Sequence, residues 1–247
     1  MTILIEACVD AIDAAVAAEQ GGADRIELCG ELLQGGVTPS AGLIGAVWER
    51  LEIPVFVLIR PRTGDFLYTE DEVDVMLRDI AVARSLDVDG VVVGALTADG
   101  DVDVSAVHKL VEAAGSMQVT FHRAFDYVRD QAVALEALIE LGVDRVLTSG
   151  GAPTALDGAA SLRKLDAQAG GRIVILAGGS ITAENAADVI HASGVEEIHV
   201  RAAATLRTRM VHRGSTISLA RTPPRDAGDR TVTSTAEMER LITAIGG

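Results

Sequence analysis

Residues 22–29 read Gly-Ala-Asp-Arg-Ile-Glu-Leu-Cys, and this stretch joins a helix-ending glycine to a short aliphatic run. The same order returns at 142–148 as Gly-Val-Asp-Arg-Val-Leu-Thr, and at 194–200 as Gly-Val-Glu-Glu-Ile-His-Val. Glycine favours the left-handed turn that closes a helix, and a short apolar run bounded by turn residues indicates a buried strand. Each copy therefore predicts that a helix ends and a strand begins.

The rest of the chain repeats this alternation. Short β-branched and aliphatic runs predict strands at residues 3–8, 25–29, 54–60, 90–95, 118–122, 145–148, 173–177 and 197–200. Between them, segments such as 10–20, 70–84, 132–141 and 183–192 carry apolar residues at helical spacing and predict helices. We expect a loop at 221–233 and a last helix at 234–245.

Alternating strands and helices predict an α/β protein with a parallel sheet and right-handed crossovers. The sheet could be open and doubly wound, or closed as a (β/α)8 TIM barrel. Eight units without a break in composition favour the barrel, and 247 residues suit one barrel of typical size. We expect a single domain over residues 1–247, in which 201–247 close the barrel with a loop and the last helix.

Composition excludes several classes of function. The net charge of −15 disfavours binding to nucleic acid or to an anionic membrane surface. The 2 cysteines are too few for a secreted disulfide framework. The amino terminus lacks the basic region of a signal peptide, and the apolar runs are too short for a membrane helix. We expect a cytoplasmic protein.

Polar residues gather where the predicted strands end, which is where TIM barrels hold their active sites. These candidate site residues are Glu6, Cys8, Glu27, Cys29, Arg60, Arg62, His122, Arg123, Asp126, Ser149, Gly150, Gly178, Gly179 and His199. Because Glu and Cys lie two residues apart in each of the first two strands, each pair faces one side of its strand.

The carboxylates of Glu6 and Glu27 need partners if they face inward, and Arg60 and Arg62 are the natural candidates. One interpretation is a buried Glu–Arg network that fixes strand register. The other is an acid–base pair of carboxylates, with the arginines holding an anionic substrate.

The fifth strand ends in a histidine that could be structural or functional. In the functional interpretation His122 is an acid or base that Asp126 orients, and Arg123 stands beside it. The glycine loops at 149–151 and 178–180 could present backbone N–H groups to an anion, or could simply close their turns.

The two cysteines also allow two interpretations. Thiolates are ligands that Cu(I) prefers, so Cys8 and Cys29 on neighbouring strands could bind it. A free cysteine in a strand is more often a small buried apolar residue. No CxxC or zinc-type spacing decides between them.

Six motifs in order resemble the CutC family of copper homeostasis proteins over about residues 3–205: GADRIELC (22–29), GGVTPS (35–40), IRPRTGDFLYT (59–69), VTFHRAFD (119–126), RVLTSGG (145–151) and AGGSIT (177–182). The resemblance implies a (β/α)8 barrel, a cytoplasmic homo-oligomer (dimer or tetramer), and Cu(I) ligands at Cys8 and Cys29. After the eighth strand the chain departs from the family pattern, with His199-Val200-Arg201-Ala202 and Val211-His212-Arg213-Gly214.

Three hypotheses follow for function. A copper-handling protein would bind Cu(I) through Cys8 and Cys29, with Glu6 or His122 as auxiliary groups. An enzyme would act on a small anionic or phosphorylated metabolite at the barrel mouth, with Glu27 or His122 moving the proton; a divalent metal held by Glu, His and Asp is a variant. A scaffold for a protein partner is the third.

Overall fold

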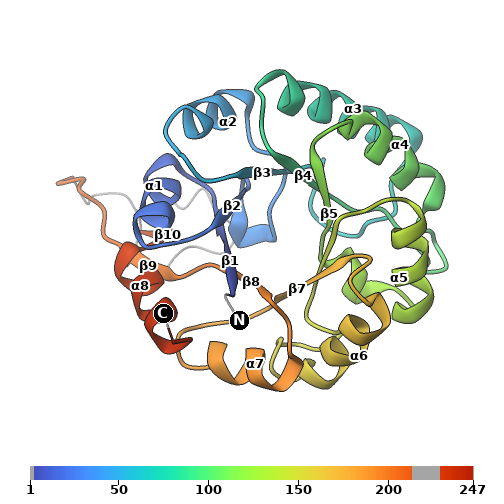
Figure 1. Ribbon diagram of the computed structural model, residues 1–247. Helices are drawn as coiled ribbons and strands as arrows, with labels where there is room; N and C mark the ends of the chain where they lie inside the picture. The colour runs from blue at the N-terminus through green and yellow to red at the C-terminus, as the bar shows by residue number, and fades with distance from the viewer. Residues whose placement is uncertain (1–2, 213–228, 247) are drawn as a thin grey trace.

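The computed structural model describes residues 3–212 and 229–246. Its strands form a closed barrel in the order β1 to β8, and every neighbouring pair is parallel (Figure 1). The strands are β1 (Leu4–Val9), β2 (Arg25–Leu28), β3 (Val55–Leu58), β4 (Gly90–Val93), β5 (Gln118–Phe121), β6 (Arg145–Thr148), β7 (Val174–Gly178) and β8 (Glu197–Val200). The predicted TIM barrel is confirmed, and the open sheet is excluded because β8 pairs with β1.

Helices surround the barrel (Figure 1). They are α1 (Ile12–Gln20), α2 (Ala41–Trp48), α3 (Glu70–Ser85), α4 (Val104–Ala114), α5 (Gln131–Glu140), α6 (Ala159–Ala169), α7 (Ala186–Ser193) and α8 (Thr235–Ala244), with short 3-10 helices η1 (Leu32–Gln34) and η2 (Arg123–Tyr127). The predicted helices are confirmed, with boundaries shifted by a few residues. The start of α3 is fixed by a capping box in which the side chains of Thr69 and Glu72 each accept a backbone N–H of the other.

The aspartate of the repeated phrase ties neighbouring strands together. Asp24, just before β2, accepts the backbone N–H of Ile5 in β1 at 2.8 Å. Asp144, just before β6, accepts the N–H of Val119 in β5 at 2.7 Å. Each carboxylate satisfies a donor at a strand's beginning, so the phrase helps set the strand register.

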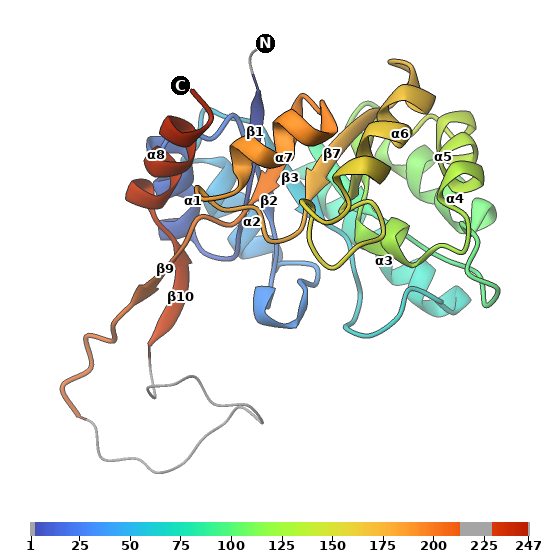
Figure 2. The same cartoon turned by 90° about the horizontal axis from the view of Figure 1, so that it is seen from below.

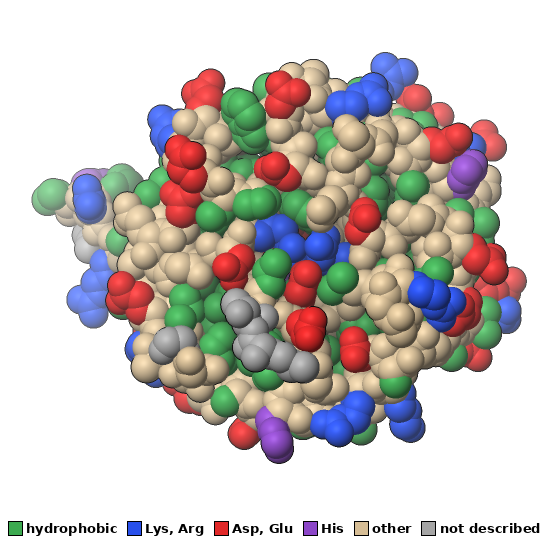
Figure 3. Space-filling view, in the orientation of Figure 1, with side chains coloured by type: hydrophobic (Ala, Val, Ile, Leu, Met, Phe, Trp, Pro, Cys, Tyr) green, Lys and Arg blue, Asp and Glu red, His purple; other side chains and the backbone are tan. Residues whose placement is uncertain are grey.

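The barrel interior is unusually charged at its amino-terminal end. Arg25, Arg145 and Glu197 are the first residues of β2, β6 and β8, and all three lie largely buried inside. At the corresponding position β4 has Gly90, and a Cβ there would overlap the ring of Phe56. Figure 3 views this end of the barrel, where basic side chains gather at the centre.

The chain continues after β8 into an antiparallel pair, β9 (Ala203–Leu206) and β10 (Arg230–Thr233). The prediction of a loop over 221–233 is therefore wrong for its last four residues, because strand β9 supplies hydrogen-bond partners that no local pattern reveals. Residues 221–228 lie outside the described part, as do 213 and 214 of the divergent stretch.

The β9–β10 pair lies at the end of the barrel opposite the amino terminus, and α8 returns to pack against α1 and α7 (Figure 2). In the described residues, no helix combines the length and apolar character needed to cross a membrane.

Candidate functional site

A cavity of about 210 Å³ opens among the carboxyl ends of the strands. Seven predicted site residues line it: Cys8, Glu27, Cys29, Arg60, His122, Arg123 and His199. The rest of the wall is formed by Gly35 and by four apolar side chains: Leu32, Leu58, Phe66 and Leu147. The other predicted residues, Glu6, Arg62, Asp126, Ser149, Gly150, Gly178 and Gly179, are not part of this lining.

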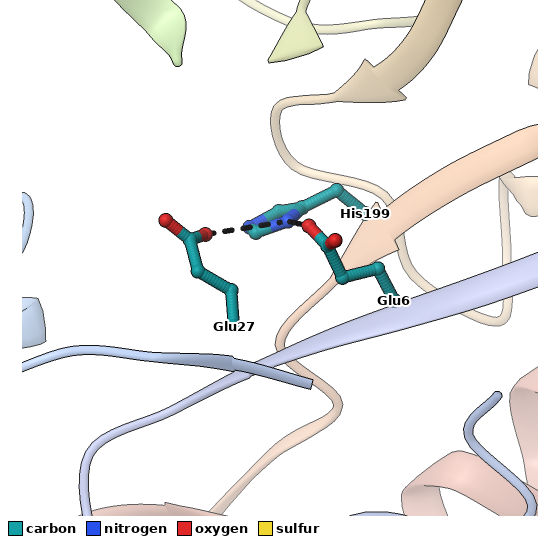
Figure 4. A group of neighbouring side chains, drawn as sticks. All are labelled: Glu6, Glu27 and His199. Carbon is teal, nitrogen blue, oxygen red and sulfur yellow. Dashed lines mark hydrogen bonds and ion pairs between the residues drawn. The ribbon is translucent and has the colours of Figure 1, made fainter. Parts of the chain in front are cut away.

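The inner end of the site is a cluster of two carboxylates and an imidazole (Figure 4). His199 Nδ1 lies 2.8 Å from Glu6 Oε1 and 3.6 Å from Glu27 Oε2. One ligand atom from each of the three residues lies within 4.8 Å of the others, so the cluster could hold a metal ion. The strand register explains why these three residues meet. Glu6 on β1 pairs with His199 on β8, and Glu27 lies on β2, which is the other strand beside β1.

Burial and charge together separate the proton affinities of the two carboxylates. Burial raises the pKa of Glu6, but the hydrogen bond to His199 and the charges of Arg25 and His199 lower it overall to about 2. Burial raises the pKa of Glu27 to about 7, despite the opposing charges of His199 and Arg25. Burial opposes the charge of His199, yet neighbouring Cys8, Glu6 and Glu27 raise its pKa well above the ordinary value.

Beneath this cluster lies an ion network that was not predicted from the sequence. Arg25 donates from Nε to Glu6 at 2.5 Å and from Nη2 to Glu197 at 2.7 Å. Arg145 reaches the same Glu197 oxygen at 2.9 Å. The sequence did contain an indication of this network. The fourth residue of the phrase that begins at 22, 142 and 194 is Arg, Arg and Glu in the three copies, and these are the residues of the network.

The expected pairing of Arg60 and Arg62 with Glu6 and Glu27 is wrong. Arg60 donates to backbone carbonyls of the loops after β2 and β3, those of Gly35, Gly36 and Gly64. Arg62 faces outward and pairs with Glu72 and Asp65. Arg25 lies directly beside Glu6 in the strand register. It therefore forms the ion pair with Glu6 that was expected of Arg60 or Arg62.

The expected role of Asp126 in orienting His122 is also wrong. Asp126 Oδ1 accepts the Thr148 hydroxyl at 2.5 Å and the backbone N–H groups of Ser149 and Gly151, each at 3.0 Å. Arg123 donates to its other oxygen at 2.7 Å. The backbone N–H groups after β6 that could have bound an anion therefore already donate to the carboxylate of Asp126.

The loop after β7 packs tightly on its neighbours. The Gly179 carbonyl accepts the N–H of Ala155 at 2.9 Å. Gly179 has φ +121°, and a Cβ there would lie 3.1 Å from that of Ser149. The glycine at this position is thus explained by close packing and backbone conformation.

His122 is held rigidly, and one of its nitrogens is unsatisfied. Its Nδ1 accepts the backbone N–H of Ala124 at 3.1 Å, and its ring packs against Phe66 with centroids 4.9 Å apart. Within the described residues Nε2 is buried without a hydrogen-bond partner. Burial and the nearby charge of Arg60 lower the pKa of His122 to about 3. The imidazole is therefore neutral at physiological pH.

The two cysteines are buried and form no disulfide. Cys8 is 8% exposed and Cys29 is 2% exposed, and both line the cavity. Burial, together with the nearby charge of Glu27, raises the pKa of the Cys29 thiol well above its ordinary value. Cys29 is therefore protonated at neutral pH unless a ligand displaces the proton.

Residues 3–204 match the sequence profile of the CutC family. The chain belongs to the CutC family. It is 48% identical to the human "Copper homeostasis protein cutC homolog" over 216 residues, covering 87% of this chain and 79% of the relative. It is 42% identical to a CutC family protein of Bacteroides thetaiotaomicron over 241 residues, covering 97% of each chain.

The fold agrees with this membership. A crystal structure of CutC from Streptococcus agalactiae superposes with a TM-score of 0.78 at 33% identity, covering 81% of this chain and 98% of that one. The family resemblance inferred from the six motifs is confirmed.

Proposed function

We propose that this CutC-family protein serves in copper homeostasis and binds Cu(I) through the sulfurs of Cys8 and Cys29 at the barrel mouth. The observation that carries the proposal is that both thiols line one cavity although they come from different strands. The name of the human relative, a copper homeostasis protein, also supports a role in copper homeostasis. The ion is cargo in this proposal.

The donor chemistry of the cavity fits a soft monovalent ion. Cu(I) favours low coordination by thiolates, and binding displaces the thiol protons. The two thiolates and one Cu(I) carry a net charge of −1, which the cationic side chain of His199 in the cavity lining can offset. Glu6, expected as an auxiliary group, is instead engaged by Arg25 and His199.

An anaerobic titration of the reduced protein with Cu(I), in competition with a chromogenic chelator, tests this proposal. The wild type should bind about one equivalent per chain, and Cys8→Ser with Cys29→Ser should abolish tight binding. Met210→Leu is the matched control, since it removes an exposed sulfur outside the cavity. Equal affinity in the double serine variant and the wild type would refute the thiol site.

An enzyme acting on a small anionic metabolite is the second candidate. It is favoured by the presence of Glu27, a potential proton carrier, in the same cavity as Arg60, Arg123 and His122. Phosphate soaked into crystals should bind beside Arg123 at the cavity rim. Crystals whose cavity stays free of the anion at high phosphate concentration would count against this candidate, whereas Cu(I) binding would be unaffected.

The proposal includes a cytoplasmic location and assembly as a dimer or tetramer. The absence of a disulfide between the buried cysteines is compatible with a reducing compartment. Light scattering on the purified protein tests the assembly, and a monomer at micromolar concentration would contradict it. Fractionation of the source cells tests the location.

A further inference from the structure

We propose that Arg60 and His122 form a subsite for the carboxylate of a small organic acid, on the side of the cavity formed by the ends of β3 and β5. This subsite does not depend on Cu(I) binding, because it uses neither cysteine. Both residues line the cavity, and each has a buried N–H group without a hydrogen-bond partner in the described part of the chain.

The tautomer of His122 is fixed by the backbone N–H of Ala124, two residues further along the chain. Since Nδ1 accepts the N–H of Ala124, the single proton of the neutral ring resides on Nε2. The unsatisfied group is therefore a hydrogen-bond donor, and it requires an acceptor atom from a ligand or water. Glycine at position 94 admits the ring, because a Cβ there would overlap it.

Arg60 supplies the positive charge. Its Nη1 and Nη2 donate to the carbonyls of Gly35, Gly36 and Gly64, and these bonds fix the plane of the guanidinium. Its Nε is buried without a partner, and no carboxylate among the described residues forms an ion pair with it. Arg60 is only 7% exposed, and a buried charge without a counter-ion is unfavourable. An anion in the cavity would remove this deficit.

The charge of the subsite and the size of the cavity indicate which kind of anion binds. One guanidinium and one neutral imidazole balance a monoanion better than a phosphate dianion, which needs more donors and more charge. The cavity of about 210 Å³ lies below the usual range for drug-sized ligands. Leu58, Phe66 and Leu147 offer apolar contacts for a short carbon chain. A small carboxylate satisfies all three conditions.

The proposal is tested by nitrogen-detected NMR of the histidine rings in the full-length protein, with acetate, pyruvate and inorganic phosphate as separate probes. His122 should show the Nε2–H tautomer and should not titrate between about pH 5 and 8. Acetate or pyruvate should shift its Nε2 resonance in a saturable manner.

Substitutions at His122 test whether its Nε2–H group binds the carboxylate. His122→Phe should weaken acetate or pyruvate binding by about tenfold or more. His122→Gln, which retains an N–H donor, should recover much of the loss. His108→Phe is the control, since His108 is exposed on α4. The Cys8→Ser, Cys29→Ser protein should bind the carboxylate as the wild type does, which distinguishes this subsite from the copper site.

Each of the following results would overturn the inference. They are an Nδ1–H tautomer, titration of His122 in the neutral range, binding of phosphate but of neither carboxylate, and carboxylate affinity that is unchanged in His122→Phe. The absence of any probe binding at high millimolar concentration would also refute it.

Discussion

His199 Nδ1 lies 2.8 Å from one carboxylate oxygen of Glu6, while Arg25 Nε holds the other oxygen at 2.5 Å. Glu6 is fully buried and both of its oxygens are engaged. We therefore assign Glu6 a supporting role, in which it orients the His199 imidazole that lines the cavity.

Glu6→Gln should destabilise the protein by about 3–5 kcal/mol, because it leaves the buried Arg25 without one of its carboxylate partners. Urea unfolding monitored by circular dichroism measures the change. Asp13→Asn is the matched control, since it breaks an exposed pair with Arg230 and should cost less than about 1 kcal/mol. Equal effects of the two substitutions would show that the buried pair contributes little.

The same carboxylate should govern stability in acid. Its folded pKa of about 2 is below the ordinary 4.5, so its contribution is present above pH 4.5 and is lost as the pH falls toward 2. The loss should amount to about 3 kcal/mol. His199 and Glu27, whose pKa values are raised, do not contribute to this decline, since such groups lose stability as the pH rises. Unfolding free energies from pH 5 to about pH 2 test this; Glu6→Gln should lack this part of the decline.

Glu197→Gln should cost about 3–5 kcal/mol, because two buried arginines, Arg25 and Arg145, share that carboxylate. Thermal and urea denaturation measure the loss. Glu184→Gln serves as control, since its pair with Arg240 is exposed and should contribute less than about 1 kcal/mol. Wild-type stability in Glu197→Gln would mean that the network is dispensable.

Gly94→Ala should destabilise the fold by about 1–3 kcal/mol and displace the His122 ring, because the added methyl group overlaps it. The NMR signals of His122 and the unfolding free energy report the two effects separately. Gly42→Ala in α2 is the control, because a Cβ at Gly42 meets nothing within 4 Å, and it should be neutral or slightly stabilising. An unperturbed His122 in Gly94→Ala would contradict the packing argument.

Arg62→Ala should leave Cu(I) and carboxylate binding unchanged, although the sequence alone suggested a role at the site. The side chain points away from the cavity and contacts Glu72, Asp65 and the carbonyl of Leu67. A modest loss of stability, about 1 kcal/mol, is expected from these partly exposed contacts. Isothermal titration calorimetry measures the binding, and a large loss of affinity would place Arg62 at the site after all.

Local patterns in the sequence predicted the architecture well. The phrase at 22–29 and its two copies located the beginnings of β2, β6 and β8 without error. The short runs located the other strands to within a few residues. The pair β9–β10 could be recognised only in part, because the strand character of Arg230–Thr233 depends on a partner distant in the chain.

The sequence predicted the location of the candidate site more accurately than the interactions of its residues. Seven of the expected residues do line one cavity, since parallel strands bring their carboxyl ends to the same edge. The partners of Arg60, Arg62 and Asp126 were wrong. Long polar side chains take whichever acceptor or donor the surrounding loops present, and sequence spacing does not define those loops.

The sequence by itself determined the TIM barrel and the end at which its polar residues gather, because the periodicity of strands and helices is a local property of the chain. Only the tertiary structure decided which charges meet. Closure of the barrel places β8 beside β1, so that His199 contacts Glu6 across 193 positions of sequence. That contact, and the buried arginines beneath it, follow from strand register and burial, which act between segments that are distant in the chain.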